Sequence, residues 1–216
     1  MADRGLSICV VTPELPDARA GNWITAARYG RILERLGHRV RLTTSYDGSP
    51  CDALIALHAR RSHPSVRRFH EAFPGKPLIV VLTGTDLYRD IRTDPDAQDS
   101  LTLATRLVVL QRMGIPELPV NHRAKTRVIY QSVSGCSPGA ARPPATFFNV
   151  AVVGHLRPEK DSLRTALAVR RLPARSRVRV THVGSALDAE MGEQARRETA
   201  SNPRYRWVGG IPHWRV

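Results

Sequence analysis

The chain has 216 residues, of which 42% are hydrophobic, and its 33 Lys and Arg against 19 Asp and Glu give a formal net charge of +14. The apolar share is large enough for a folded core, which excludes an intrinsically disordered chain. The positive charge favours an anionic partner, but the arginines are scattered along the chain and only three lysines are present. No zinc-ligand spacing, RNA-recognition signature or basic heptad helix accompanies the charge, so we expect no nucleic-acid partner.

Cysteine content and hydropathy bear on the compartment. Cys9, Cys51 and Cys136 are too few and too unevenly spaced for a disulfide framework or a metal cluster. They favour a reducing compartment, and we expect a cytoplasmic protein. No apolar run reaches the roughly 20 residues of a membrane-spanning helix, and we expect neither a membrane span nor a targeting segment.

In the first 131 residues, short β-branched runs alternate with segments of helical periodicity. Several runs are apolar throughout, which predicts strands covered on both faces, as in a parallel sheet flanked by helices. A helix is predicted from Asn22, interpreted as its N-cap, to Leu36, with Gly37 at its end. A second helix is predicted at 64–73, and 89–100 predicts a short helix plus a loop. The predicted strands are 6–12, 39–43, 53–57, 78–82, 106–110 and 127–130.

Residues 132–146 are dense in Pro, Gly and Ser and predict a linker between two domains. The predicted class is therefore α/β, with two Rossmann-like parallel-sheet domains at 1–131 and 147–216. Since α/β domains usually exceed about 100 residues, we expect the second domain to be truncated. Its predicted elements are a buried strand at 147–153, a helix at 158–172, a strand at 178–183, a helix at 186–199 and a strand at 205–208.

Polar groups precede the first helix and follow the strand 53–57. Gly21 and Asn22 lie where backbone amides and the helix dipole favour a phosphate, although the spacing alone favours a simple turn and cap. Arg60 and Arg61 come directly after the strand and suit fork-like hydrogen bonding to phosphate-type oxygens. Solvated surface arginines are the alternative interpretation.

The strand 78–82 also ends in polar residues. Thr83 and Thr85 can supply hydrogen-bond donors, and Arg89 can close on an anion. Asp86 can act as a catalytic base or as an orienting group, and the alternative is that it caps the short helix that follows. Because ligands of open α/β sheets bind outside the carboxyl ends of the strands, these groups predict an anion-binding crevice.

A comparable cluster opens the second domain. Arg157 and Lys160 stand three residues apart after Gly154, at the start of the predicted helix, where their charges can converge on a diphosphate. A solvated first turn is the alternative. We expect the crevices of the two domains to face one another.

Several of these motifs resemble glycosyltransferase family 4, of the GT-B fold. The similarity is carried by the Gly-Asn loop before the first helix, by Leu-Gly-His-Arg-Val at 36–40 and by Val-Gly-x-Leu-x-Pro-Glu-Lys at 153–160. Val-Gly-Ser at 183–185 and Trp-Val-Gly-Gly-Ile-Pro-His at 207–213 match later landmarks. The resemblance implies transfer of a sugar from a nucleotide sugar.

The resemblance also implies site residues. The donor diphosphate would be bound by Gly21, Asn22, His155, Arg157 and Lys160, with His155 standing where the family has an arginine. The resemblance implies no metal and no cofactor beyond the UDP-sugar substrate.

A narrower set of motifs, at 58–62, 82–91, 123–132 and 154–157, is similar to the selenosugar synthases (SenB type) of selenoneine biosynthesis. That branch joins a UDP-N-acetylhexosamine to selenophosphate with formation of a carbon–selenium bond, and the resemblance implies this reaction. A small, highly charged acceptor needs cations and hydroxyls around it. The candidate acceptor-binding residues are Arg60, Arg61, Thr83, Thr85 and Arg89, with Asp86 as the candidate catalytic residue.

Two other functions remain open at this point. One is an ordinary family 4 glycosyltransferase that acts on a sugar or lipid hydroxyl, and the other is a non-enzymatic phosphate- or nucleic-acid-binding module. Family members continue into a Glu-x7-Glu region that holds the donor, and this sequence ends before it, so we expect weak binding of a nucleotide sugar.

Overall fold

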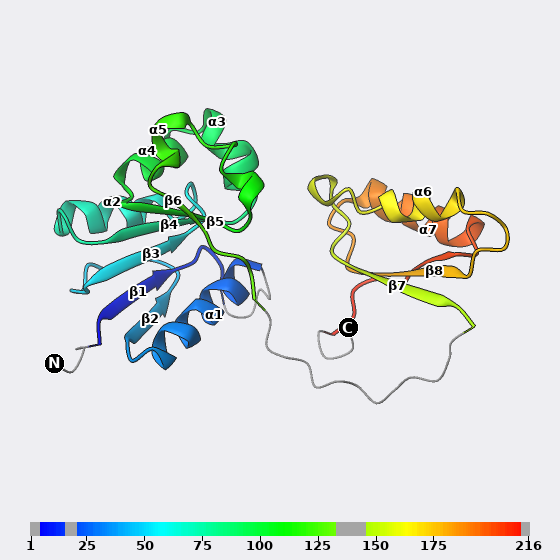
Figure 1. Ribbon diagram of the computed structural model, residues 1–216, viewed down its shortest axis with the longest axis horizontal. Helices are drawn as coiled ribbons and strands as arrows, with labels where there is room; N and C mark the ends of the chain where they lie inside the picture. The colour runs from blue at the N-terminus through cyan, green and yellow to red at the C-terminus, as the bar shows by residue number, and fades with distance from the viewer. Residues whose placement is uncertain (1–4, 16–20, 133–145, 213–216) are drawn as a thin grey trace. The chain divides into compact units, whose positions relative to one another are not determined.

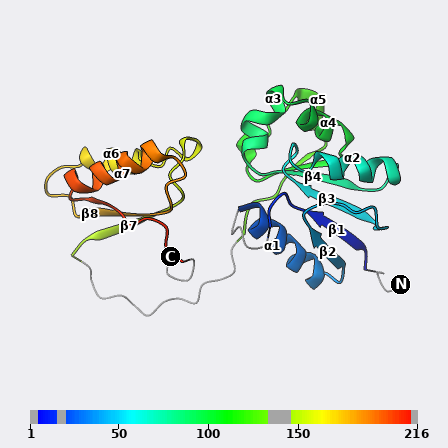
Figure 2. The same cartoon turned by 180° about the vertical axis from the view of Figure 1, so that it is seen from behind.

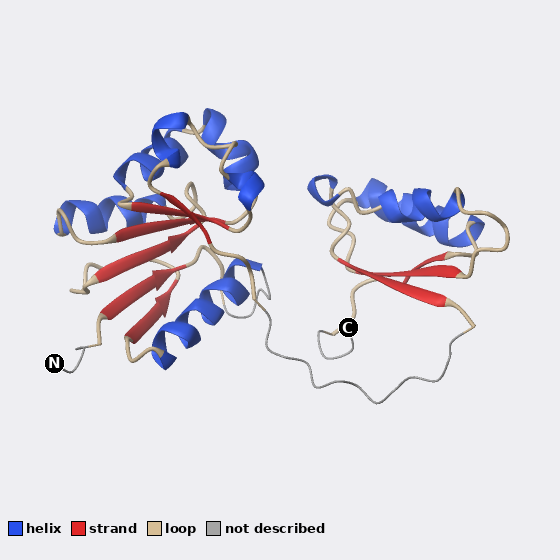
Figure 3. Cartoon of the chain, viewed as in Figure 1, coloured by secondary structure: helices blue, strands red, loops and turns tan. Residues whose placement is uncertain are grey.

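The computed structural model describes residues 5–15, 21–132 and 146–212. The chain divides into two compact units, 1–134 and 135–216, and the division falls within the predicted linker 132–146. Residues 133–145, which include Cys136, lie outside the described part. Figure 3 shows that each unit contains a sheet packed against helices.

The first unit is built on a six-stranded parallel sheet with the order β2-β1-β3-β4-β5-β6. The strands β2, β3 and β4 have the predicted bounds, and the others differ by one or two residues at an end. The chain runs from β1 outward to β2 and then returns across β1 to β3, so the strand order reverses between β1 and β3. The strands are β1 (Ser7–Val11), β2 (Arg39–Thr43), β3 (Ala53–Leu57), β4 (Leu78–Leu82), β5 (Arg106–Val109) and β6 (Thr126–Val128).

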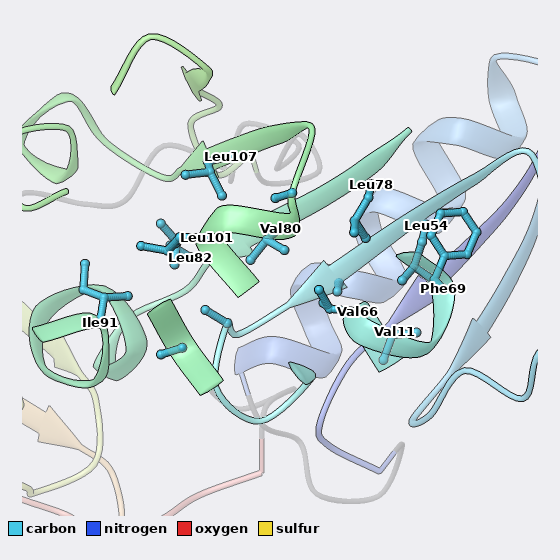
Figure 4. Close-up of a cluster of buried hydrophobic side chains, with 14 of the residues drawn as sticks. Val11, Leu54, Val66, Phe69, Leu78, Val80, Leu82, Ile91, Leu101 and Leu107 are labelled. Carbon is cyan, nitrogen blue, oxygen red and sulfur yellow. The ribbon is translucent and has the colours of Figure 1, made fainter. Parts of the chain in front are cut away.

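Helices cover both faces of this sheet, as Figures 1 and 2 show. Helix α1 (Gly21–Arg35) lies on one face, and α2 (His63–Ala72) and α4 (Pro95–Leu103) lie on the other. Alternate residues of one strand enter opposite cores: Val81 packs on the α1 side, and Val80 packs on the α2 side (Figure 4). This two-sided burial explains why the strand sequences are apolar throughout.

The segment between β4 and β5 holds more helix than the predicted short helix plus loop. It forms a π-helical turn η2 (Asp86–Asp90), then α3 (Ile91–Thr93) and α4. The side chain of Asp94 caps α4 by accepting the N–H of Ala97 at 2.9 Å, and Pro95 occupies the first helical position. The short elements η3 (Arg112–Gly114) and α5 (Val120–Arg123) were not expected.

The second unit contains a three-stranded parallel sheet, β7-β8-β9, with α6 (Arg164–Arg170) and α7 (Ala189–Ser201) on the same face (Figure 1). The strand predicted at 147–153 is present as β7, but its predicted burial is wrong. Phe148 is 69% exposed and Val153 is 64% exposed, and β7 lies at the edge of the sheet. The strands are β7 (Phe148–Val153), β8 (Val178–Val183) and β9 (Tyr205–Trp207).

The predicted helix at 158–172 is interrupted. Pro158–Lys160 forms a 3₁₀ turn, η4, and Asp161 then adopts a left-handed conformation with φ of 45°, which ends the turn. Helix α6 begins only at Arg164. Proline favours the first turn of either kind of helix, so the sequence signal did not distinguish them.

The loops after β7 and β8 approach each other closely at Gly184. This residue has φ of 155°, and a Cβ atom added to it would overlap the carbonyl group of Gly154. The carbonyl oxygen of Gly184 accepts the indole N–H of Trp207 at 2.8 Å. Gly154 itself has no atom within 4 Å of such a Cβ.

We predict that Gly184→Ala destabilises the second unit by at least about 2 kcal/mol, because the overlap is with backbone that must move. Gly154→Ala is the matched control and should change the stability by less than about 1 kcal/mol. Urea unfolding followed by tryptophan fluorescence in a Trp23→Phe background measures both. Equal midpoints for the two variants would contradict the prediction.

Candidate functional site

Polar residues gather at the carboxyl ends of β1, β3 and β4, where the strand order reverses and α/β sheets bind ligands. The loops after β1 and β3 are joined by the guanidinium group of Arg61. Its Nη1 donates to Oε1 of Glu14 at 2.6 Å, and its Nη2 donates to the carbonyl oxygen of Pro13 at 3.1 Å. The side chain of Arg61 nevertheless remains 42% exposed.

Asp86 ties the loops after β3 and β4 together. Its carboxylate accepts the backbone N–H groups of Ala59 at 3.0 Å, Thr83 at 3.0 Å and Gly84 at 2.8 Å, and the residue is fully buried. Of the roles that the sequence left open, these contacts are those of an orienting group. A carboxylate without exposed surface does not face a substrate in this conformation, so the geometry gives no support to Asp86 as a catalytic base.

Asp90 is a second buried carboxylate, and the sequence analysis missed it. Its Oδ2 accepts Nε–H of Arg60 at 2.9 Å, and its Oδ1 accepts Nε–H of Arg89 at 3.1 Å. The Asp90 side chain is only 6% exposed, whereas Arg60 is 43% and Arg89 is 64% exposed. Each arginine uses its Nε in this pair, so its Nη groups stay available as donors on the exposed side.

His58 lies close to both Thr85 and Asp90. It belongs to the motif 58–62, but the sequence analysis gave it no role. It follows β3 directly with φ of 71°, and it is only 3% exposed. Its Nε2 lies 3.2 Å from Oγ1 of Thr85 and 4.0 Å from Oδ2 of Asp90. Burial lowers the pKa of His58 below its usual value, against the opposing charges of Asp86 and Asp90, and so favours the neutral imidazole.

The structure brings the candidate acceptor residues together on the loops after β3 and β4, but it corrects how they were expected to act. Arg60 and Arg89 share Asp90, and Arg61 pairs with Glu14, so none of the three is a bare cation. Thr83 contributes its backbone N–H to Asp86, and the hydroxyl of Thr85 meets His58. The pairing was not predicted. Glu14 lies outside the quoted motifs, and Asp90 lies within the motif 82–91 but was given no role.

The candidate diphosphate residues of the first unit lie at the start of α1. The helix begins at Gly21, so Asn22 belongs to its first turn and is not the N-cap that the sequence predicted. The carbonyl oxygen of Gly21 accepts the hydroxyl of Thr25 at 2.8 Å. The hydroxyl oxygen of Thr25 in turn accepts an amide N–H of Gln131 at 3.0 Å.

The candidate diphosphate residues of the second unit follow β7. Nδ1 of His155 accepts the N–H of Ser185 at 3.1 Å, which joins the loops after β7 and β8. Arg157 is extended and Lys160 ends the 3₁₀ turn, so the expected placement of both at an α-helix N-terminus is wrong. Their place in the fold therefore offers the two side-chain charges, without the dipole of α6.

Two further expectations concern metals and membranes. Within the described ranges, no three His, Cys, Asp or Glu side chains gather in a way that holds a metal ion. In the same part of the chain, no helix is long and apolar enough to cross a bilayer. Cys9 and Cys51 are buried free thiols, and burial raises the pKa of Cys9 to about 11.

Comparison with known proteins gives matches among solved structures, whereas no protein-family model and no curated protein matches the chain. HepE of Anabaena in complex with UDP is 13% identical, with a TM-score of 0.60 over 95% of this chain and 69% of that chain. Its complex with UDP-glucose is 14% identical, with a TM-score of 0.57 over 96% of this chain and 70% of that chain. The apo form of WaaB, a lipopolysaccharide outer core galactosyltransferase, is 13% identical, with a TM-score of 0.55 over 97% of this chain and 70% of that chain.

These similarities confirm the predicted fold class. The chain has the α/β architecture of the GT-B glycosyltransferases, built from parallel sheets. At identities of this size the likeness concerns the fold, and the selenosugar synthase resemblance stays a prediction.

We predict that Asp86→Ala destabilises the first unit by about 2–5 kcal/mol, since one buried and two half-buried N–H groups lose their acceptor. Asp94→Ala is the matched control, because that carboxylate accepts a single N–H at a helix N-cap, and its loss should cost about 1 kcal/mol. Denaturant unfolding gives the stabilities, and hydrogen exchange at the amides of Ala59, Thr83 and Gly84 localises the change. Unaltered exchange at these amides in Asp86→Ala would show that the carboxylate does not hold the loops.

Proposed function

We propose that this chain is a glycosyltransferase-like selenosugar synthase. In this reaction an N-acetylhexosamine passes from a UDP-sugar to selenophosphate, with formation of a carbon–selenium bond, as a cytoplasmic step of selenoneine biosynthesis. The observation that carries the proposal is the group of arginines and threonines at the carboxyl ends of β3 and β4, which suits a small, highly charged acceptor.

The charge of this group is compatible with such an acceptor. Arg60, Arg89 and Asp90 together carry a net charge of +1, while Arg61 and Glu14 cancel one another. The exposed Nη groups of the arginines are charge-assisted donors, which bind phosphate-type oxygens more strongly than neutral donors do. A neutral hydroxyl acceptor gains little from three guanidinium groups.

The GT-B architecture supports the donor half of the proposal. HepE, which shares the fold, has been crystallised with UDP and with UDP-glucose. We assign the diphosphate of a UDP-sugar to His155, Arg157 and Lys160 of the second unit. Gly21 and Asn22, at the start of α1, are the phosphate-binding candidates of the first unit. Exposed cations suit this task because charge develops on the leaving diphosphate as it departs.

The chemistry needs no general base. Selenium, which already carries negative charge in selenophosphate, attacks the anomeric carbon, and the bond from that carbon to the diphosphate oxygen breaks. UDP leaves with the bonding electron pair. A hydroxyl nucleophile would instead have to lose a proton to a base, and the buried Asp86 is not exposed to supply one. The observed role of Asp86 is therefore consistent with an anionic nucleophile.

The second candidate is an ordinary glycosyltransferase that acts on a hydroxyl, which the shared fold with the galactosyltransferase WaaB favours. The two are separated by supplying UDP-N-acetylglucosamine with either selenophosphate or a panel of sugar acceptors and measuring UDP release and product mass. UDP release that requires selenophosphate, with a product containing selenium, supports the proposal. Glycosylation of a hydroxyl acceptor without use of selenophosphate overturns it.

We predict that Arg60→Gln weakens binding of thiophosphate, a stable analogue of selenophosphate, by about ten- to a hundredfold, the range of one charge-assisted hydrogen bond. Arg67→Gln is the matched control, because Arg67 is an exposed arginine of the same unit that also pairs with a carboxylate, that of Glu71 at 2.9 Å. It should leave the affinity within about twofold of the wild type. Isothermal titration calorimetry measures both, and equal losses in the two variants would argue for a general effect of charge.

A further inference from the structure

We infer that His58 is a positioning residue that fixes the hydroxyl of Thr85 as a hydrogen-bond donor to the anionic acceptor. The inference rests on the proposed function for the identity of the acceptor. It goes beyond that function because it assigns a role to a buried side chain that is not among the candidate site residues.

The first step is the tautomer of the imidazole. Nδ1 of His58 accepts the backbone N–H of Arg61 at 3.4 Å, so Nδ1 carries a lone pair. Burial favours the neutral ring, and its one proton must therefore reside on Nε2. The carboxylate of Asp90, 4.0 Å from Nε2, favours a proton in that place.

The second step is the direction of the Thr85 hydroxyl. Nε2–H points at Oγ1 of Thr85, 3.2 Å away, so the hydroxyl oxygen acts as the acceptor in that contact. A threonine hydroxyl has a single proton, and this proton must then point away from the imidazole. Among the described residues, Oγ1 of Thr85 has no second hydrogen-bond partner, and the residue is half-buried.

The consequence is a directed donor. The ionised oxygens and the selenium of selenophosphate are acceptors, and they match a hydroxyl whose proton faces outward. A neutral sugar hydroxyl can donate as well as accept, and it would not need the direction to be fixed. The chain of contacts thus selects for an anion by geometry, in addition to the charge of the arginines.

The conformation of His58 supports a dedicated role. It is one of two non-glycine residues with positive φ in the described part of the chain, a conformation that is strained for a residue with a Cβ atom. Backbone contacts hold it: the N–H of His58 donates to Val81 at 2.9 Å, and its carbonyl oxygen accepts the N–H of Ser62 at 3.0 Å. A ring held this tightly can set the orientation of its neighbour.

The test is a double-mutant cycle on thiophosphate affinity, measured by calorimetry. Thr85→Val should weaken binding by about tenfold, whereas Thr85→Ser, which keeps the hydroxyl, should stay within about threefold. His58→Leu should lose about fivefold in the wild-type background and nothing further in the Thr85→Val background. His58→Gln, whose amide can replace the Nε2–H donor, should restore most of the affinity.

Additive losses in the cycle would show that His58 supports the loop in general, and they would overturn the inference. The tautomer gives an independent readout: nitrogen NMR of the wild-type chain should find the His58 proton on Nε2, and a proton on Nδ1 would overturn the inference as well. If the wild-type chain binds neither thiophosphate nor selenophosphate, the proposed function fails and the inference fails with it. Intact binding with additive losses, or with the other tautomer, overturns the inference alone.

Discussion

One buried carboxylate organises the candidate site. Asp86 collects N–H groups from the loop after β3 and from the loop after β4, and so fixes the distance between the arginines of one and the threonines of the other. The same peptide segment is held from its other side, because the carbonyl oxygen of Ala59 accepts the hydroxyl of Ser100 from α4 at 2.7 Å. A buried carboxylate is expensive unless its oxygens are satisfied, and here three donors satisfy it.

The ion pairs on the loops that Asp86 holds orient side chains more than they stabilise the fold. Exposed or half-exposed pairs contribute little to the free energy of folding, typically about 0–1 kcal/mol. Arg60 and Arg89, however, keep their long side chains in one place by bonding to Asp90 through Nε, which leaves their Nη groups out of this contact. An arginine that is already oriented loses less conformational entropy when an anion arrives, so the pairing preorganises the site and moderates its charge.

The sequence predicted the sheet of the first unit closely and the side-chain pairing poorly, for physical reasons. Runs such as Leu78–Leu82 are apolar on both faces, and only a strand buried on both sides needs that pattern. The place of the site also followed, since loops at the carboxyl ends of parallel strands share one edge. The pairing partners Glu14 and Asp90 were not predicted, because the bonds from Arg61 to Glu14 and from Arg60 to Asp90 span 47 and 30 residues and leave no trace in local spacing.

The second unit shows the limit of reading a strand or helix from composition alone. The apolar residues of β7 predicted burial, but an edge strand exposes whatever its neighbours do not cover, and neighbours are a property of topology. The candidate diphosphate residues of the second unit have fewer fixed contacts than the loops held by Asp86 in the first. Lys160 is exposed, and the ring of His155 accepts one N–H, that of Ser185. The charged side chains of the first unit are thus held by contacts among its own residues, whereas those that follow β7 in the second unit have fewer such contacts. Positions fixed by the fold itself need no ordering when a ligand binds, and this is the physical difference between the two clusters.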